Sequence, residues 1–214
     1  MRSLLVRVSV LFALLGALGA QDLAWRHTAV VDVYRVSSFS AAFGDTDRDG
    51  FVDVAWEGQA RSVDGRPLAY VIAVCSGRDG RMLRYWGVPT GQNVTRLSAF
   101  GDLDEDGIGD YGMRIKMNSG IDRVEARSGA DDRVLWRMDR DSSTAFGASL
   151  GGGLDVDGDG HLEVVVTHPR AGPNGSVVVI DRFGRLVRQI AGTPSLAIGA
   201  QFGRCIDVVG DVDG

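Results

Sequence analysis

The stretch "LDVDGDGHLE" at residues 154–163 places aspartates at alternate positions, Asp155, Asp157 and Asp159, and follows them with Gly160. Carboxylates this close together repel one another unless an opposite charge lies among them. A simple turn needs one Asp or Asn, and not a series at fixed alternate positions. The stretch therefore indicates a loop in which a divalent cation offsets the repulsion.

The same acidic pattern occurs four times along the chain. It returns as "GDTDRDGFVD" at 44–53, as "GDLDEDGIGD" at 101–110 and, incompletely, as "GDVDG" at 210–214. The first aspartates are Asp45, Asp102, Asp155 and Asp211, which are separated by 57, 53 and 56 residues. A constant period just above 50 residues indicates a repeat architecture, with one structural unit per repeat.

Each repeat has the same surroundings. A stretch with Phe-Gly precedes the acidic loop, and a strand-like run such as "FVDVAW" or "HLEVVVTH" follows it. Two further strand-like runs with a polar turn between them come next, at 70–86, 122–138 and 175–190. Such pairs are typical of β-hairpins. A repeat of about 55 residues therefore supplies four short strands, which is the content of one propeller blade.

The fold predicted from these repeats is all-β. It consists of β-propeller blades of four antiparallel strands, with about three complete blades and the start of a fourth. Propellers have 4–8 blades. Because the last acidic stretch stops before its third expected aspartate, we expect a partial propeller, a fragment of a longer protein.

The carboxylates of each loop stand at positions 1, 3, 5 and 9, with glycine at position 6. Calcium takes six to eight oxygen ligands in flexible geometry, and the glycine permits the sharp turn that aims them at one point. Position 7 then offers a backbone carbonyl. We expect about one Ca²⁺ per complete loop, and the predicted ligands are Asp45, Asp47, Asp49, Phe51 and Asp53; Asp102, Asp104, Asp106, Ile108 and Asp110; Asp155, Asp157, Asp159, His161 and Glu163; and Asp211 and Asp213 of the incomplete loop.

These loops differ from EF-hands, which need a bidentate Glu at position 12 and a helix on each side. Position 12 holds Trp56, Met113 and Val166, and the flanking runs are strand-like.

The N-terminus has the composition of a secretory signal. Arg2 and Arg7 precede an uncharged apolar run from Val8 to Ala20, which ends in small residues. The run is short for a bilayer-spanning helix, which needs about 20 residues. We predict a signal peptide over 1–20, a lead-in strand over 21–36 and the repeats over 37–214. The protein is then secreted, at the cell surface or periplasmic, with no membrane span after signal removal; an uncleaved anchor or a buried N-terminal helix is the alternative.

Two cysteines, Cys75 and Cys205, lie in strand-like runs 130 residues apart. A disulfide would require the two runs to be neighbours, which the repeat order disfavours. We expect two buried, unpaired thiols.

Several function classes receive no support from the sequence. The net charge of −5 disfavours a basic face for nucleic acid. The histidines, His27, His161 and His168, show no zinc-ligand spacing, and neither a nucleophile elbow nor a phosphate loop is present. We therefore expect no catalytic site.

The third repeat resembles the FG-GAP repeats of the integrin α-subunit propeller. Phe146-Gly147 is followed by the acidic loop and a strand, although Thr167-His168-Pro169 replaces the family's Gly-Ala-Pro. In the first two repeats Phe43-Gly44 and Phe100-Gly101 directly adjoin the loop. The resemblance implies a propeller whose Ca²⁺ ions brace loops on one face, and a role in adhesion or ligand binding.

The function expected from this resemblance is that of an exported, calcium-binding propeller acting as an extracellular binding, adhesion or scaffold module. Its partner would be a protein or glycan held on a propeller face. The alternative is a non-catalytic propeller within a larger exported enzyme, of the polysaccharide lyase or lipase type.

Overall fold

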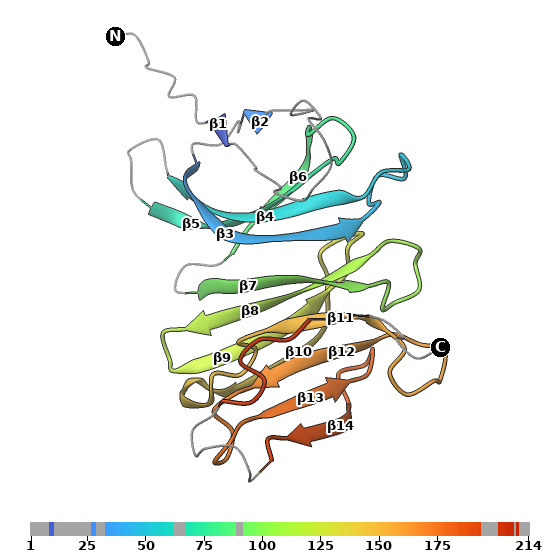
Figure 1. Ribbon diagram of the computed structural model, residues 1–214. Coiled ribbons are helices and arrows are strands. Elements are labelled where there is room, and N and C mark those ends of the chain that lie inside the picture. Colours follow the sequence, from blue (N-terminus) through green and yellow to red (C-terminus); the bar gives the residue numbers. More distant parts are fainter. Residues whose placement is uncertain are drawn as a thin grey trace, which may run out of the picture.

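Three antiparallel sheets of four strands follow one another along the chain (Figure 1). The computed structural model describes residues 9–10, 27–28, 33–61, 67–88, 92–193, 201–207 and 209. Asp211 and Asp213 of the incomplete loop lie outside the described residues. Of the predicted signal peptide, only Ser9–Val10 is described; it forms the short strand β1, which pairs with β2 (His27–Thr28).

Each sheet contains four consecutive strands in sequential order. The first consists of β3 (Val33–Gly44), β4 (Asp53–Arg61), β5 (Pro67–Cys75) and β6 (Met82–Gly87). The second consists of β7 (Gln92–Gly101), β8 (Asp110–Met117), β9 (Ile121–Arg127) and β10 (Val134–Asp141). The third consists of β11 (Leu150–Leu154), β12 (Glu163–His168), β13 (Ser176–Ile180) and β14 (Leu186–Ala191). One 3-10 turn, η1 (Ser142–Thr144), precedes β11.

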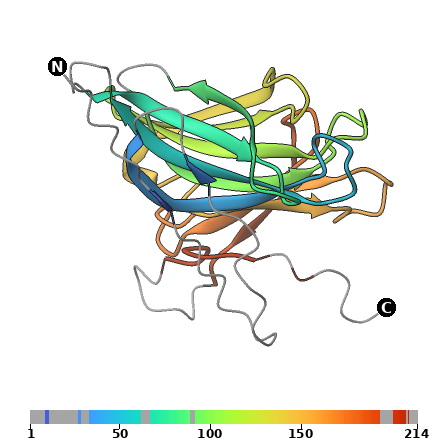
Figure 2. The same ribbon diagram turned by 90° about the horizontal axis from the view of Figure 1, so that it is seen from above.

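The all-β prediction of four-stranded blades, one per repeat, is confirmed. Neighbouring blades meet through their first strands, because β7 contacts β3 on one side and β11 on the other. These strands are therefore the inner strands, and β6, β10 and β14 are the outer ones. Over the described residues the three blades form an open arc without closing into a ring, as the two views show (Figures 1 and 2).

Two hydrophobic clusters hold the blades together. The cluster between the first and second blades includes Phe43, Ile72 and Tyr111, and the rings of Phe43 and Tyr111 stack with their centroids 4.6 Å apart. The cluster between the second and third blades includes Phe100 and Val166. Side chains alternate across a strand, so the second blade offers one face to the first blade and the other to the third, and is stabilised by both.

Phe100 shows why a phenylalanine comes just before the acidic loop. The register of β7 and β8 shifts between Ala99 and Gly101, so Phe100 is the extra residue of a β-bulge. Its buried ring covers Gly112 of its own blade, where an added Cβ would lie 1.8 Å from the ring's Cζ. Gly152 of the next blade also approaches Phe100, because a Cβ added there would lie 2.8 Å from the Phe100 Cα. Phe100 therefore sets the distance between two blades.

Phe146-Gly147 has a different position from the other two Phe-Gly pairs. It precedes β11, and the bulge of the third blade falls instead at Gly153. The Gly147 amide donates to the carbonyl of Thr167 at 2.7 Å, and a Cβ on Gly147 would lie 2.6 Å from Val124 of the second blade. This pair thus fastens the third blade to the second from the side opposite the acidic loop.

The expectation for the cysteines is half right. Neither is in a disulfide, and Cys75 is buried in β5, where the Trp56 indole N–H contacts its sulfur at 3.4 Å. Cys205, however, is exposed and lies in a turn and not in a strand. Its segment contacts the third blade, where the Phe202 amide donates to the carbonyl of Asn174. Within the described part of the chain, no helix is long and apolar enough to cross a membrane.

Candidate functional site: three acidic loops

The three complete acidic loops occupy the same place in each blade. They join the inner strand to the second strand, between β3 and β4, β7 and β8, and β11 and β12. All three emerge on the same side of the arc, at the right of Figure 1. The repeat spacing in the sequence therefore becomes a row of like loops on one face of the molecule.

The first carboxylate of each loop organises the turn. The two oxygens of Asp102 accept the amides of Asp106 and Gly107 at 3.0 and 2.8 Å. Asp45 and Asp155 accept the corresponding amides of their own loops. Position 6 requires glycine, because its φ is +89° at Gly50 and +85° at Gly107.

The carboxylate at position 9 is the most buried of each set, with an exposed fraction of 0% for Asp53 and Asp110 and 1% for Glu163. It is the first residue of the second strand, and its carboxylate accepts a hydrogen bond from the backbone amide at position 2. Leu103 donates this bond to Asp110, and Val156 donates it to Glu163. Burying an ionised carboxylate is costly unless hydrogen bonds or a cation stabilise the charge. These amides anchor the group at the base of the loop.

Positions 1, 3 and 9 converge in every loop. One carboxylate oxygen from each of the three residues lies within 4.8 Å of the other two. The sets are Asp45, Asp47 and Asp53; Asp102, Asp104 and Asp110; and Asp155, Asp157 and Glu163.

The position-5 carboxylates, predicted as ligands, are not in these groups. Asp49, Asp106 and Asp159 each turn one oxygen to the amide two residues later, at 3.0, 2.8 and 2.9 Å. Aspartate commonly makes this local hydrogen bond in a turn, and the role of these three carboxylates as ligands stays a prediction. The backbone carbonyls of Phe51, Ile108 and His161 stay predictions.

The electrostatics of the loops reflect this crowding. The pKa of Asp110 is raised to about 6, chiefly by burial; the amides of Gly129 and Leu103 lower it, and the charge of Asp104 raises it. Burial also raises the pKa of Asp104, and the charge of Asp106 adds to the effect. The pKa of Glu163 is raised by burial and then by the other three carboxylates of its loop. The second and third loops thus hold negative charge that a cation would stabilise.

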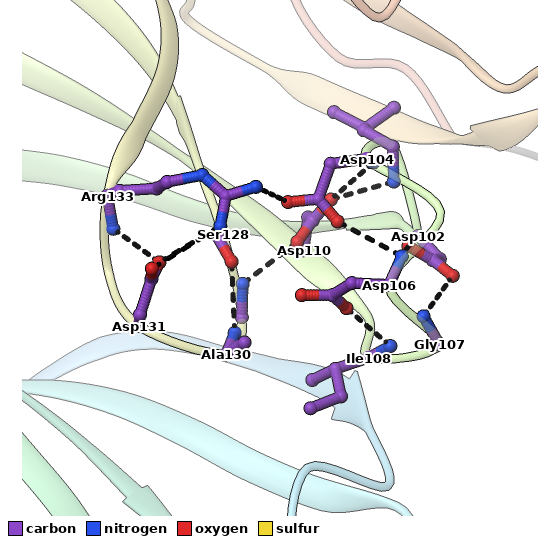
Figure 3. A network of polar contacts seen from close by, with 12 residues as sticks. Asp102, Asp104, Asp106, Gly107, Ile108, Asp110, Ser128, Ala130, Asp131 and Arg133 are labelled. Atoms are coloured by element: carbon purple, nitrogen blue, oxygen red, sulfur yellow. Dashed lines mark hydrogen bonds and ion pairs between the residues drawn. The ribbon is translucent and has the colours of Figure 1, made fainter.

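A hairpin of the same blade closes over each of the first two loops, which the sequence analysis missed. In the second blade, the Gly129 amide donates to Asp110 at 2.8 Å, and the Arg133 guanidinium donates to Asp104 at 2.6 Å (Figure 3). In the first blade, Gly77 donates to Asp53 at 3.1 Å and Arg81 to Asp47 at 2.7 Å. The repeated Ser-Gly-x-Asp-x-Arg of the two turns, at 76–81 and 128–133, is the sequence signal for this contact.

The third blade is built differently. Arg182 stands where the other turns have glycine, and its guanidinium contacts Glu105 of the second loop, as does His161 Nδ1 of the third loop at 2.7 Å. The hairpin therefore reaches back to the neighbouring blade, and among the described residues no hydrogen bond or ion pair joins it to its own acidic loop. An open pocket of about 360 Å³ lies beside this contact, lined by Leu103, Asp104, Glu105, Leu135, Arg182 and Phe183.

The donor atoms of the loops suit a hard cation. All are carboxylate oxygens, the ligand type that Ca²⁺ prefers. In the first loop, Oδ1 of Asp47 is buried without a hydrogen-bond partner, while its Oδ2 is held by Arg81. A buried acceptor without a donor is uncommon, and a metal ion is one of the groups that satisfy it.

Comparison with known proteins identifies one repeat. Residues 146–180 match the family model described as FG-GAP repeat. No curated protein matches the chain. Among solved structures, the chain is similar to the crystal structure of rhamnogalacturonan lyase YesW, with 14% sequence identity and a TM-score of 0.32 over 76% of this chain and 43% of the lyase chain. This chain therefore spans less than half the length of that lyase.

Proposed function

Residues 146–180 are an FG-GAP repeat, and from this premise we propose that the chain is an exported, calcium-stabilised β-propeller module that binds a ligand and does not catalyse a reaction. The observation that carries the calcium proposal is the convergence of three carboxylates within 4.8 Å at the same place in three successive blades. One such cluster is ordinary on a protein surface, whereas three in equivalent positions indicate a property of the repeat itself.

The residues at positions 1, 3 and 9 would hold the cation in each loop. When bound, Ca²⁺ supplies the positive charge that the carboxylates lack. Position 1 shapes the turn through its amide contacts, and the buried position 9 ties the site to the second strand of the blade. Filling the loops therefore stiffens the joint between the inner strand and the rest of each blade.

The predicted signal peptide supports export, and the presence of millimolar calcium outside cells would suit sites on an extracellular module. We propose a protein or glycan ligand on a propeller face. Immobilised polysaccharides and cell-surface proteins, probed with the purified chain in calcium and in chelator, would test this. Turnover of a polysaccharide by the chain would contradict the non-catalytic role.

The calcium proposal is tested by thermal unfolding and by calorimetric titration of the chelator-treated protein with CaCl₂. We expect a higher melting temperature in calcium and heats for up to three sites. Asp157→Ala should remove one site and reduce the chelator-sensitive part of the melting temperature. Asp139→Asn, which removes an equal charge outside the loops, serves as the control. Absence of both the heat and the melting shift in the unmodified protein would overturn the proposal.

A further inference from the structure

The turns over the three acidic loops can be compared residue by residue, because the same backbone hydrogen bond closes each hairpin. The amides of Ser76, Ser128 and Asp181 donate to the carbonyls of Arg81, Arg133 and Arg185, each at 2.9 Å. Each hairpin therefore carries an arginine at one equivalent position. The first two turns hold four residues inside this hydrogen bond, at 77–80 and 129–132, and the third holds three, at 182–184.

The two longer turns bring their arginine onto the acidic loop. Arg81 and Arg133 reach the position-3 aspartates, Asp47 and Asp104. Glycine makes this approach feasible, because a Cβ on Gly129 would lie 1.8 Å from the carbonyl oxygen of Gly109, and one on Gly77 would lie 1.9 Å from that of Val52.

The shorter third turn sends its arginine elsewhere. Arg185 lies over the ring of Phe183, with 5.3 Å between the guanidinium carbon and the ring centroid. Arg182 replaces the close-approach glycine and pairs with Glu105 of the second blade. Within the described residues, Asp157 has no ion pair, and both Asp155 and Asp157 are exposed. Position 9 is the longer Glu163, which accepts the Val156 amide; within the described residues no hydrogen bond joins it to the hairpin.

We infer that Arg81 and Arg133 set the calcium affinity of the first two loops, and that the third loop, which has no such arginine, binds calcium first. This inference rests on the proposed calcium binding. It assigns the two arginines a regulating role that is separate from the carboxylates that hold the ion.

The direction follows from electrostatics. A divalent cation bound by Asp47 or Asp104 would share that carboxylate with an arginine guanidinium. The cation and the guanidinium, both positive and on one carboxylate, repel each other, and even in water this repulsion lowers the calcium affinity about tenfold. An arginine that holds the aspartate in place could also raise the calcium affinity. This benefit is small, because an ion pair with an exposed partner contributes little free energy. Arg81 and Arg133 are both more than half exposed, at 61% and 51%. Repulsion therefore dominates, and we expect the third loop to bind roughly tenfold more tightly.

The test is calorimetric titration of the chelator-treated full chain with CaCl₂ at physiological salt. The unmodified protein should show one tight site and two sites about tenfold weaker. Arg81→Gln and Arg133→Gln should each convert one weak site into a tight one, and the double variant should show three similar sites. Arg185→Gln, at the equivalent position of the third hairpin, should change nothing. Asp157→Asn should abolish the tight site and leave the weak ones.

A charge-conserving variant separates repulsion from positioning. Arg81→Lys keeps the positive charge without the planar fork, so its site should stay weak. Three equal sites in the unmodified protein, or weaker binding in Arg81→Gln and Arg133→Gln, would overturn the inference while leaving calcium binding intact. No binding at any loop would instead overturn the proposed function. Circular dichroism of each variant confirms that the fold is retained.

Discussion

Phe100 and Gly112 pack directly against each other in the second blade. The ring occupies the space that a side chain at position 112 would need, and it is completely buried. Close-packed interiors accommodate extra atoms only by shifting the backbone or forcing unfavourable rotamers.

We therefore expect Gly112→Ala to lower the free energy of unfolding by about 2 kcal/mol, because the new methyl group displaces the Phe100 ring. Urea denaturation monitored by tryptophan fluorescence measures this. Gly87→Ala is the matched control, since a Cβ there meets nothing within 4 Å, and it should leave stability nearly unchanged. Equal stability of both variants would show that the ring can move without cost.

At the scale of elements, each of the first two acidic loops depends on a hairpin that is adjacent in space but about 20 residues distant in sequence. Gly129 connects the β9–β10 turn to Asp110, which lies at the start of β8. The buried carboxylate would lose one of its backbone donors if the turn moved away.

Gly129→Ala should therefore lower the free energy of unfolding by about 2 kcal/mol or more, through the clash with the Gly109 carbonyl and the lost hydrogen bond to a charged acceptor. It should also weaken calcium binding at the second loop and leave the third unaffected. Calorimetry and urea denaturation, with Gly87→Ala again as the control, check both parts. A loss of calcium binding at all three loops would contradict the local role of this contact.

The elements themselves were predictable because their signals are local. The Asp-rich loops and the polar hairpin turns each lie within about ten residues, and together with the repeat period they predicted four strands per blade. The convergence of positions 1, 3 and 9 also follows from the spacing of Asp102, Asp104 and Asp110 in one tight turn.

The contacts between elements were not predictable in the same way. Arg133 meets Asp104 across 29 residues, and Arg182 meets Glu105 across 77. Such pairs depend on how hairpins fold over loops and on how blades stack, which no single stretch encodes. Position 5 was assigned as a ligand because its spacing is regular; one oxygen of Asp106 accepts a neighbouring amide, and the ligand role of this position stays a prediction. Cys205 was assigned to a strand from its apolar neighbours alone.

At the scale of the whole molecule, the outer strand of the third blade is its most exposed edge. All six residues of β14 are exposed, including Leu186 at 60% and Ile190 at 45%. An unpaired apolar edge strand can pair with the same strand of another molecule.

We expect self-association that grows with protein concentration, and we expect Ile190→Lys to reduce it, because a charge on an edge strand opposes pairing. Light scattering coupled to size-exclusion chromatography measures the association. Ser143→Lys, an exposed position in η1 away from this edge, is the control for the added charge. A monomer at all concentrations in the unmodified protein would show that the β14 edge is protected.

The common direction of the three acidic loops gives the molecule an electrical polarity. The loops lie on one side of the arc (Figure 1), and each holds a group of converging carboxylates, so the molecule behaves as a permanent dipole as well as a weakly charged body. Such a body turns its negative side toward any positively charged surface before it makes contact. Calcium bound in the loops would reduce this dipole far more than it changes the shape of the protein. Because the loops would then carry less negative charge, retention on an anion exchanger becomes a measure of how many loops are occupied.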